Sequence, residues 1–224
     1  MDRILLDIET QNDFFTPGGS CHNGESARVA KQIGRLFDWV RHENIPVIST
    51  VLRVRRFDRG PLSPRPHCIE GTEGEAKLSG TILRRRIDFG LRNVTDLPKN
   101  LFGKYQQAIF EKRDTDIFAH ARLERLITEL PRVTFVVCGA GLAQGIAQAT
   151  VGLRSRGFGV IVATDAVLDM GDRLSDMARL RMEAKGAIFA PTGEIIIPTP
   201  KRKARPFRVP AIQEAKILAR SARK

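Results

Sequence analysis

The chain has 224 residues, of which 42% are hydrophobic and 28% charged, as is ordinary for a globular protein. This length suits one α/β domain with a substantial core, and no apolar run approaches the roughly 20 residues of a membrane helix. A strand-like segment begins almost at the N-terminus and leaves no room for a signal peptide, and Cys21, Cys68 and Cys138 lack CxxC spacing. We therefore expect a cytoplasmic protein with reduced thiols and no membrane partner.

The formal net charge of +12 is distributed unevenly. Residues 201–224 carry nine Lys or Arg and one Glu, a charge of +8, so the other 200 residues hold only +4. The basicity is therefore mostly a property of the C-terminal tail and says little about the chemistry of the domain.

The first half of the chain alternates between strand-like and helical patterns. Residues Arg3–Ile8 read as a strand buried on both faces. Apolar residues then recur at helical spacing from Val29 to Val40, and Pro46–Leu52 reads as a second strand. Residues 53–105 are irregular and rich in Arg, Pro and Gly.

The second half repeats the alternation. Strands are predicted at Gln107–Lys112, Val133–Cys138, Val160–Ala163 and Ala187–Ala190, with helices at Ala119–Leu130, Ala143–Arg156 and Leu174–Ala184. A small extra strand is expected at Glu194–Ile197 and a short helix at Ile212–Ala222. This order indicates βαβ units and a three-layer α/β/α fold with a mostly parallel six-stranded sheet. We expect one domain over residues 1–198, with a basic loop at 53–105, and a basic tail over 199–224.

Ligands bind such sheets beyond the carboxyl ends of the strands, so the residues after Ile8, Lys112 and Cys138 are the places to inspect. Recognisable motifs follow there in order. They are Gln11-Asn12-Asp13-Phe14 with Gly18-Gly19, then His67-Cys68-Ile69-Glu70-Gly71-Thr72, Lys112 six residues before Phe118, Val136-Val137-Cys138-Gly139, and Thr164-Asp165-Ala166. Together these motifs resemble the isochorismatase-like cysteine hydrolases, nearest the nicotinamidases.

The resemblance implies a catalytic triad of cysteine, aspartate and lysine. The cysteine attacks an amide carbon, the aspartate acts as general base and acid, and the lysine favours the thiolate. Here the lysine is Lys112, the aspartate position is occupied by Glu9, and the nucleophile position falls on Gly145. The resemblance also implies a cis peptide between Ala140 and Gly141, which forms an oxyanion hole. Phe14 is expected to wall the substrate pocket.

Glycine offers no nucleophile, so thiol catalysis at Gly145 is impossible. The metal site of nicotinamidases also lacks counterparts, because residues 52–66 contain no histidine, and Pro64 replaces an aromatic wall of the pocket. We therefore predict neither metal nor cofactor. The leading hypothesis is a degenerate family member retained for ligand sensing or interaction. An active hydrolase of small amides that uses Glu9 and Lys112, or a relocated thiol, is the alternative.

Several residues keep two interpretations. Glu9 and Lys112 form either a catalytic pair or a structural ion pair, and Asp7 would replace Glu9 if the strand were shifted by two residues. Asp7, Glu9, Asp114 and Asp116 are either solvated carboxylates or a hard-cation site, with the solvated reading preferred. Cys68 and Cys138 read as small packed hydrophobes. His67 reads as a residue that organises its loop.

The basic residues suggest partners. Residues 79–100 resemble an insertion and, with the arginines of 53–65, predict either a contact with a polyanion or nucleic acid, or an arm that packs on a neighbouring subunit. The tail predicts nonspecific polyanion affinity. The resemblance itself implies a homo-oligomer and a small-molecule ligand. A nucleic-acid-associated scaffold is therefore a third hypothesis.

Overall fold

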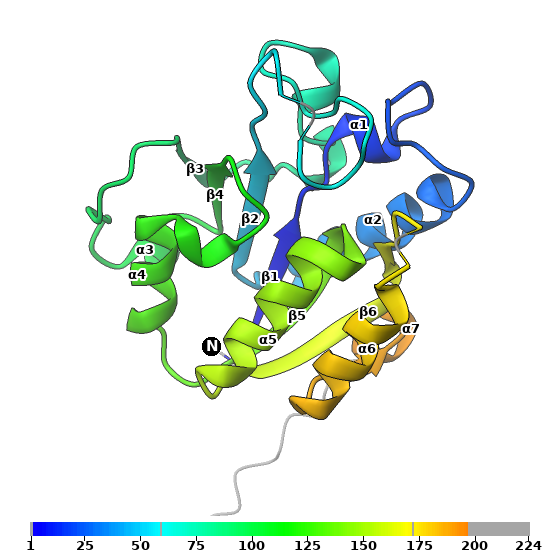
Figure 1. The fold of residues 1–224 in the computed structure, drawn as a ribbon. Helices are drawn as coiled ribbons and strands as arrows, with labels where there is room; N and C mark the ends of the chain where they lie inside the picture. Colours follow the sequence, from blue (N-terminus) through cyan, green and yellow to red (C-terminus); the bar gives the residue numbers. More distant parts are fainter. Residues whose placement is uncertain (1, 59, 172, 197–224) are drawn as a thin grey trace, which may run out of the picture.

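The computed structural model, which describes residues 2–58, 60–171 and 173–196, is built on one twisted sheet (Figure 1). Its seven strands follow the order β3-β4-β2-β1-β5-β6-β7, and every neighbouring pair is parallel. The strands are β1 (Arg3–Ile8), β2 (Val47–Leu52), β3 (Arg86–Phe89), β4 (Gln107–Lys112), β5 (Thr134–Ala140), β6 (Gly159–Leu168) and β7 (Ile188–Ala190). The strand order steps away from β1 in both directions, so the carboxyl ends of β1, β4 and β5 come together at one edge.

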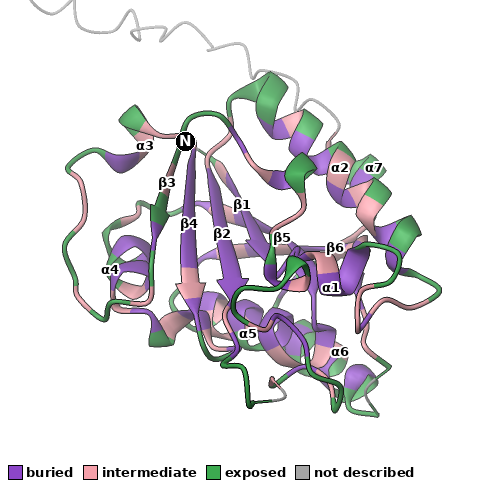
Figure 2. Ribbon diagram, turned by 90° about the horizontal axis from the view of Figure 1, so that it is seen from above, coloured by how far each residue is buried: buried purple, intermediate pink, exposed green. Residues whose placement is uncertain are grey.

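Helices cover both faces of the sheet. One buried apolar cluster packs α4 (Ala121–Glu129), α5 (Ala147–Ser155) and α6 (Ser175–Ala184), with α3 (Leu101–Lys104) near the edge. The other cluster packs α1 (Asn12–Phe15), α2 (Ser26–Glu43) and α7 (Thr192–Ile195). Short 3₁₀ turns lie at Glu73–Glu75, Ser79–Thr81 and Ile117–Ala119, and a π turn at Leu142–Ile146 precedes α5. The central strands are buried and the outer helix surfaces exposed (Figure 2), so the prediction of a three-layer α/β/α fold is confirmed.

The predicted strand count was one too low. The additional strand, β3, lies in the region expected to be irregular and pairs with the edge of β4. Its four residues Arg-Ile-Asp-Phe are mostly exposed or half-buried, so they carry too short a pattern for recognition in the sequence. The small extra strand predicted at Glu194–Ile197 is also wrong for its described part. Pro191 precedes a helical turn there, and Asp165 accepts hydrogen bonds from Thr192 N and Oγ1, both at 2.7 Å.

The other strands and helices predicted within the described residues are present, although β6 runs to Leu168 instead of ending at Ala163 and the short helices α1 and α3 were not predicted. In α2 the side chains of Val29, Ile33, Leu36, Phe37 and Val40 are buried, which is the apolar stripe that the spacing indicates. That helix ends at Asn44, whose left-handed backbone (φ +51°) terminates the helical hydrogen bonding. The basic tail over 199–224, its predicted helix at Ile212–Ala222 and the domain boundary near 198 lie outside the described residues. No helix within the described ranges is long and apolar enough to cross a membrane.

Gly139 near the end of β5 permits a close approach to β1. A Cβ atom there would lie 1.8 Å from the carbonyl oxygen of Ile8, and φ is +127°. The pairing of β5 with β6 shifts register between Val137 and Gly139. Gly139 therefore allows β5 to turn out of the sheet where the loop to α5 begins.

Candidate active site

Glu9 and Lys112 form an ion pair at the carboxyl ends of β1 and β4. Lys112 Nζ lies 2.8 Å from Glu9 Oε1, and the two side chains are 3% and 0% exposed, respectively. Thr50 on β2 donates a hydrogen bond to the same Glu9 oxygen at 2.7 Å, and Lys112 Nζ donates to the carbonyl of Asp114. The prediction that Glu9 and Lys112 lie together is confirmed.

The backbone of Glu9 explains how its side chain reaches this place. Its φ of +48° is left-handed, which is uncommon for a residue with a side chain. Its N–H donates to Thr50 O at 3.3 Å, and its carbonyl accepts from Gln11 N at 2.9 Å. The chain therefore turns sharply directly after β1. Side chains alternate between the two faces of the sheet along β1 as far as Ile8, but this alternation does not determine the direction of the Glu9 side chain.

Gly145 lies on the π turn that opens α5, directly opposite the Glu9 carboxylate. A Cβ atom at Gly145 would lie 3.0 Å from Glu9 Oε2 and 3.3 Å from Ile8 Cγ2. Glu9 Oε2 has no hydrogen-bond partner among the described residues. The carboxylate thus points at the position where the sequence pattern expects a nucleophilic side chain, and its extra methylene brings it close to the backbone there. π turns recur at functional sites, which agrees with this location.

Ala140 and Gly141 continue from β5 beside this site. The expected cis peptide between them is wrong, because every peptide bond of the described residues is trans. Gly141 turns the chain with φ of +83°, and its N–H donates to Leu168 O at 3.0 Å, so the amide bonds to the neighbouring strand. A Cβ at Gly141 would lie 2.8 Å from Leu62 Cδ2, which places Leu62 against this corner.

Phe14 is fully buried and packs on His67, with ring centroids 5.6 Å apart. It shares an apolar cluster with Leu62 and Ala140. Phe14 therefore packs against side chains of the protein, and these fill the space beside its ring.

Asp7 belongs to a separate ion pair. Lys77 Nζ lies 2.5 Å from Asp7 Oδ2, and Ser49 donates to the same oxygen at 2.8 Å. Asp7 and Glu9 are both fully buried, so the expectation that they are solvated was wrong for this pair. Asp114 and Asp116 instead accept hydrogen bonds from backbone N–H groups of their own loop. Among the described residues no group of three His, Cys, Asp or Glu side chains could hold a metal ion.

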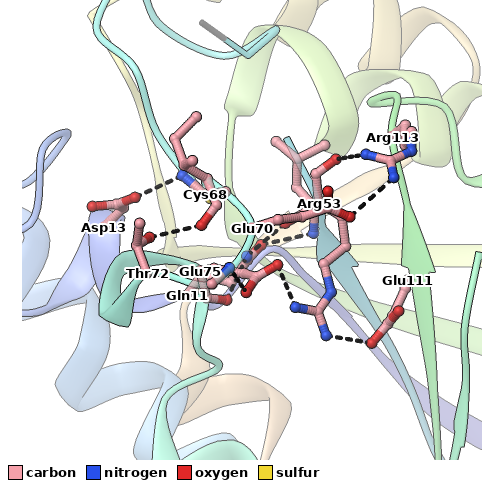
Figure 3. A network of polar contacts seen from close by, with 12 residues as sticks. Gln11, Asp13, Arg53, Cys68, Glu70, Thr72, Glu75, Glu111 and Arg113 are labelled. Carbon is pink, nitrogen blue, oxygen red and sulfur yellow. Dashed lines mark hydrogen bonds and ion pairs between the residues drawn. The ribbon is translucent and has the colours of Figure 1, made fainter. Parts of the chain in front are cut away.

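The Gln-Asn-Asp motif holds the loop that contains His67 and Cys68 (Figure 3). Gln11 donates to the carbonyls of Leu52 and Glu75, both at 2.8 Å, and accepts from Leu52 N. Asp13 accepts from Cys68 N at 2.6 Å. The two motifs are therefore joined by hydrogen bonds between side chains and backbone groups, which hold the loop in place.

Arg53 and Arg113 extend the network toward β4. Arg53 forms ion pairs with Glu75 and Glu111, while Arg113 donates to Glu70 at 2.9 Å and to the carbonyl of Arg53. Arg53 was expected among residues that attract a polyanion, whereas here acidic groups of the same chain neutralise its charge.

A cavity of ≈ 260 Å³ opens beyond the end of β4. Lys112 lines it together with charged and polar side chains from both sides, among them Arg92, Asn93, Arg113, Asp114 and His120. Arg92 and Asn93 lie in the segment expected to be an insertion, and His120 carried no recognisable pattern. The sequence did not indicate this cavity because its lining residues lie up to 29 positions apart, from Leu91 to His120, and no spacing marks them.

The two cysteines that flank the site are poor nucleophiles. Burial, aided by the carboxylates of Asp13 and Glu9, raises the pKa of Cys68 far above its ordinary value. Burial and the charge of Asp7 likewise raise the pKa of Cys138. Both thiols therefore stay protonated near neutral pH, as expected for packed hydrophobic residues.

Comparison with known families connects this geometry to a domain type. The isochorismatase domain model matches residues 90–194, a range that includes Lys112, Ala140, Gly141 and Gly145. The chain carries an isochorismatase domain. The resemblance predicted from the sequence motifs is therefore confirmed. A search of the curated proteins finds no match for the sequence.

Solved structures extend the isochorismatase-like fold over most of the chain. Nicotinamidase from Bacillus subtilis is similar with a TM-score of 0.63 and 21% identity over 85% of this chain and 99% of that one. N-carbamoylsarcosine amidase from Thermoplasma acidophilum gives 0.63 and 16% identity over 86% and 97%. MAR1 ribonuclease from Caenorhabditis elegans gives 0.58 and 18% identity over 87% and 79%. At these identities the similarity establishes the fold.

Proposed function

We propose that this isochorismatase-like chain has lost the thiol chemistry of its family and is retained for ligand sensing or for an interaction. One observation carries the proposal. Gly145 provides no nucleophile, and the Glu9 carboxylate lies within 3.0 Å of the point where its Cβ would be. A cysteine side chain would have to enter space next to a carboxylate that is one methylene longer than the aspartate of the family pattern.

The remaining groups support the same conclusion. Covalent catalysis needs an activated nucleophile beside its base. The thiols of Cys68 and Cys138 have raised pKa values, so neither replaces the missing group. Lys112 pairs with the Glu9 carboxylate, and position 145 offers no thiol for it to activate. Lys112 thus serves as the counter-ion of Glu9.

The cavity next to Lys112 supports ligand sensing. At ≈ 260 Å³ it is smaller than a typical drug-sized site, and both cationic and anionic side chains line it. These features fit a small polar molecule. Its occupant would lie against Lys112, which is also the ion-pair partner of Glu9.

Ammonia release from nicotinamide and from N-carbamoylsarcosine tests the loss of thiol chemistry. We expect no turnover above the rate without protein. Gly145→Cys should introduce a thiol that a haloacetamide labels, and Gly145→Ala is the matched control that adds bulk without sulfur. Robust turnover by the wild-type protein that disappears in Glu9→Gln would contradict the proposal.

A second function, hydrolysis by activated water, rests on one further observation. Glu9 Oε2 has no hydrogen-bond partner among the described residues, so one lone pair of a buried carboxylate is available to a water molecule. A panel of small amides would test it. Activity in the wild type and in Gly145→Ala, with loss in both Glu9→Gln and Lys112→Met, would favour this mechanism over the first.

Exposed cationic residues support a third function, contact with nucleic acid. Phe57 is 94% exposed and follows the exposed Arg55 and Arg56, an arrangement suited to stacking against an unpaired base. MAR1 of C. elegans, a similar structure, is a ribonuclease by its title. Salt-dependent RNA binding that survives deletion of residues 199–224 but weakens in Phe57→Ser would support this function. Absence of binding at low salt would remove it.

The predicted homo-oligomer is also a proposal. Met177 and Leu180 on α6 and Ile188 on the edge strand β7 are exposed apolar side chains. Sedimentation velocity of the wild type and of a Met177→Ser, Leu180→Ser variant would test whether this surface joins subunits.

A further inference from the structure

A second cavity opens along the loop that follows β2 and shares Arg113 with the cavity beside Lys112. Its volume is ≈ 380 Å³, and Arg53, Arg55, Arg113 and Asp58 are the charged residues that line it in the described part of the chain. This volume lies at the lower end of the range of small-molecule sites. Three arginines against one carboxylate favour an occupant that carries an oxyanion.

Two of these arginines are held in fixed positions. Arg53 forms ion pairs with Glu75 and Glu111, and Arg113 donates to Glu70 at 2.9 Å and to the carbonyl of Arg53 at 3.3 Å (Figure 3). The three glutamates do not belong to the lining of the cavity, so they lie behind the arginines. A guanidinium has more N–H donors than these contacts use, and both groups are therefore oriented in advance for an oxyanion.

Arg55 supplies the positive charge that is not matched. Its side chain is exposed and forms no ion pair or hydrogen bond with any other described residue. The backbone beside it is anchored, because Val54 N donates to Cys68 O and Glu70 N donates to Val54 O, both at 2.9 Å. Since carboxylates already balance the other two arginines, Arg55 decides that an anion is preferred in this cavity.

Phe57 lies on a tight turn at the edge of the same cavity. Asp58 N donates to Arg55 O at 2.9 Å, which closes the turn and leaves Arg56 and Phe57 at its tip. Both ends of the turn line the cavity, whereas the phenyl ring is 94% exposed, more than any other large hydrophobic side chain described. An exposed aromatic ring next to cationic side chains is a platform on which a nucleic-acid base stacks.

We propose that this cavity and Phe57 together bind a nucleoside 5′-monophosphate, with the phosphate on the arginines and the base on the ring of Phe57. The inference rests on the contact with nucleic acid proposed above and names the unit that is bound. Asp58 repels the phosphate, so it faces the ribose, whose hydroxyls donate to its carboxylate. A free nucleotide and the 5′-phosphorylated end of a single-stranded RNA both offer this chemistry.

Isothermal titration of the full-length protein with AMP, adenosine and inorganic phosphate tests the proposal. AMP should bind at least ~10-fold more tightly than either fragment, because each fragment lacks one of the two contacts. Phe57→Ser should weaken AMP binding at least ~5-fold and leave phosphate binding unchanged, since it removes only the stacked ring. Arg55→Met should weaken the binding of AMP and of phosphate alike, by ~10-fold.

Two matched variants control for charge and for exposed apolar surface. Arg35→Met removes an exposed arginine on α2, and Leu180→Ser removes a side chain on α6 that is 64% exposed. Both should leave the affinity for AMP unchanged. All four side chains are exposed, and circular dichroism checks that each variant is folded. AMP binding that neither Phe57→Ser nor Arg55→Met weakens would be nonspecific attraction to a basic chain and would overturn the proposal.

Fluorescence anisotropy with a short 5′-phosphorylated RNA, alone and in competition with AMP, separates the two sources of the nucleotide. Displacement of the RNA by AMP would support the proposal with an RNA end as the occupant. AMP binding without RNA binding would support it with a free nucleotide as the occupant, and would remove the contact with nucleic acid. RNA binding without any binding of AMP would overturn the proposal and leave the contact with nucleic acid standing.

Discussion

The buried pair of Glu9 and Lys112 makes a quantitative prediction about stability. Glu9→Gln keeps the shape of the side chain and removes its charge, which leaves a lysine that is 3% exposed without a carboxylate partner. Removing one partner of a buried pair typically costs about 3–5 kcal/mol of unfolding free energy. Lys112→Met should cost a similar amount, because it leaves the Glu9 carboxylate uncompensated.

The double variant Glu9→Gln, Lys112→Met should be far less destabilised than the sum of the two single variants. Replacing both charges removes the pair together with its desolvation penalty, and such replacements are often neutral. Urea unfolding followed by circular dichroism, at a pH near 7, measures all four members of the cycle. Asp7→Asn with Lys77→Met forms a matched second cycle on an equally buried pair.

Single losses below about 1 kcal/mol, or a double variant that loses the sum of the single ones, would refute this reasoning. The first result would mean that water reaches the pair. The second would mean that the two charges do not interact, in conflict with the 2.8 Å contact.

Three further predictions follow from other contacts. Gly139→Ala should lower the free energy of unfolding, measured with urea, by at least about 3 kcal/mol, because its Cβ would lie 1.8 Å from Ile8 O. The control Gly18→Ala, which also has a positive φ but lies at an open position, should lose less than half of that. Gln11→Ala should lower the free energy of unfolding by about 3 kcal/mol, because it leaves buried backbone groups of Leu52 and Glu75 unpaired. Asn12→Ala removes an exposed hydrogen bond and should lower it by less than about 1 kcal/mol, so equal losses would contradict this reading. Burial lowers the pKa of His120, so as pH falls this residue takes up a proton in the unfolded chain before it does so in the folded one. The contribution of His120 to the free energy of unfolding should be complete above about pH 6.5 and decrease below it. His120→Gln should therefore lose less unfolding free energy between about pH 7.5 and 5.5 than the wild type.

Sequence patterns predicted the sheet and its layers well, because long buried strands and amphipathic helices carry strong periodicity. They failed at β3 and α7, where four-residue segments depend on neighbours such as Asp165 rather than on their own sequence. The ion pair of Glu9 and Lys112 was predictable, because parallel strands bring their carboxyl ends together.

Other parts of the site left no trace in the sequence. The left-handed backbone of Glu9 and the contact of Leu62 with Gly141 depend on packing between segments far apart in the chain. The trans peptide at Ala140 also departs from the family expectation.

The hydrogen bonds of Gln11 and Asp13 have a consequence for how such chains are recognised. The side chains of both residues tie the loop after β2 to the start of α1, and the bond to the Glu9–Lys112 pair described above is made by the backbone N–H of Gln11, which donates to Glu9 O. Selection on folding alone would therefore preserve the Gln-Asn-Asp and His-Cys motifs in a chain that has glycine at position 145. Searches that use these motifs as a signature will therefore collect chains with and without a cysteine at the position of Gly145, which the motifs themselves do not distinguish.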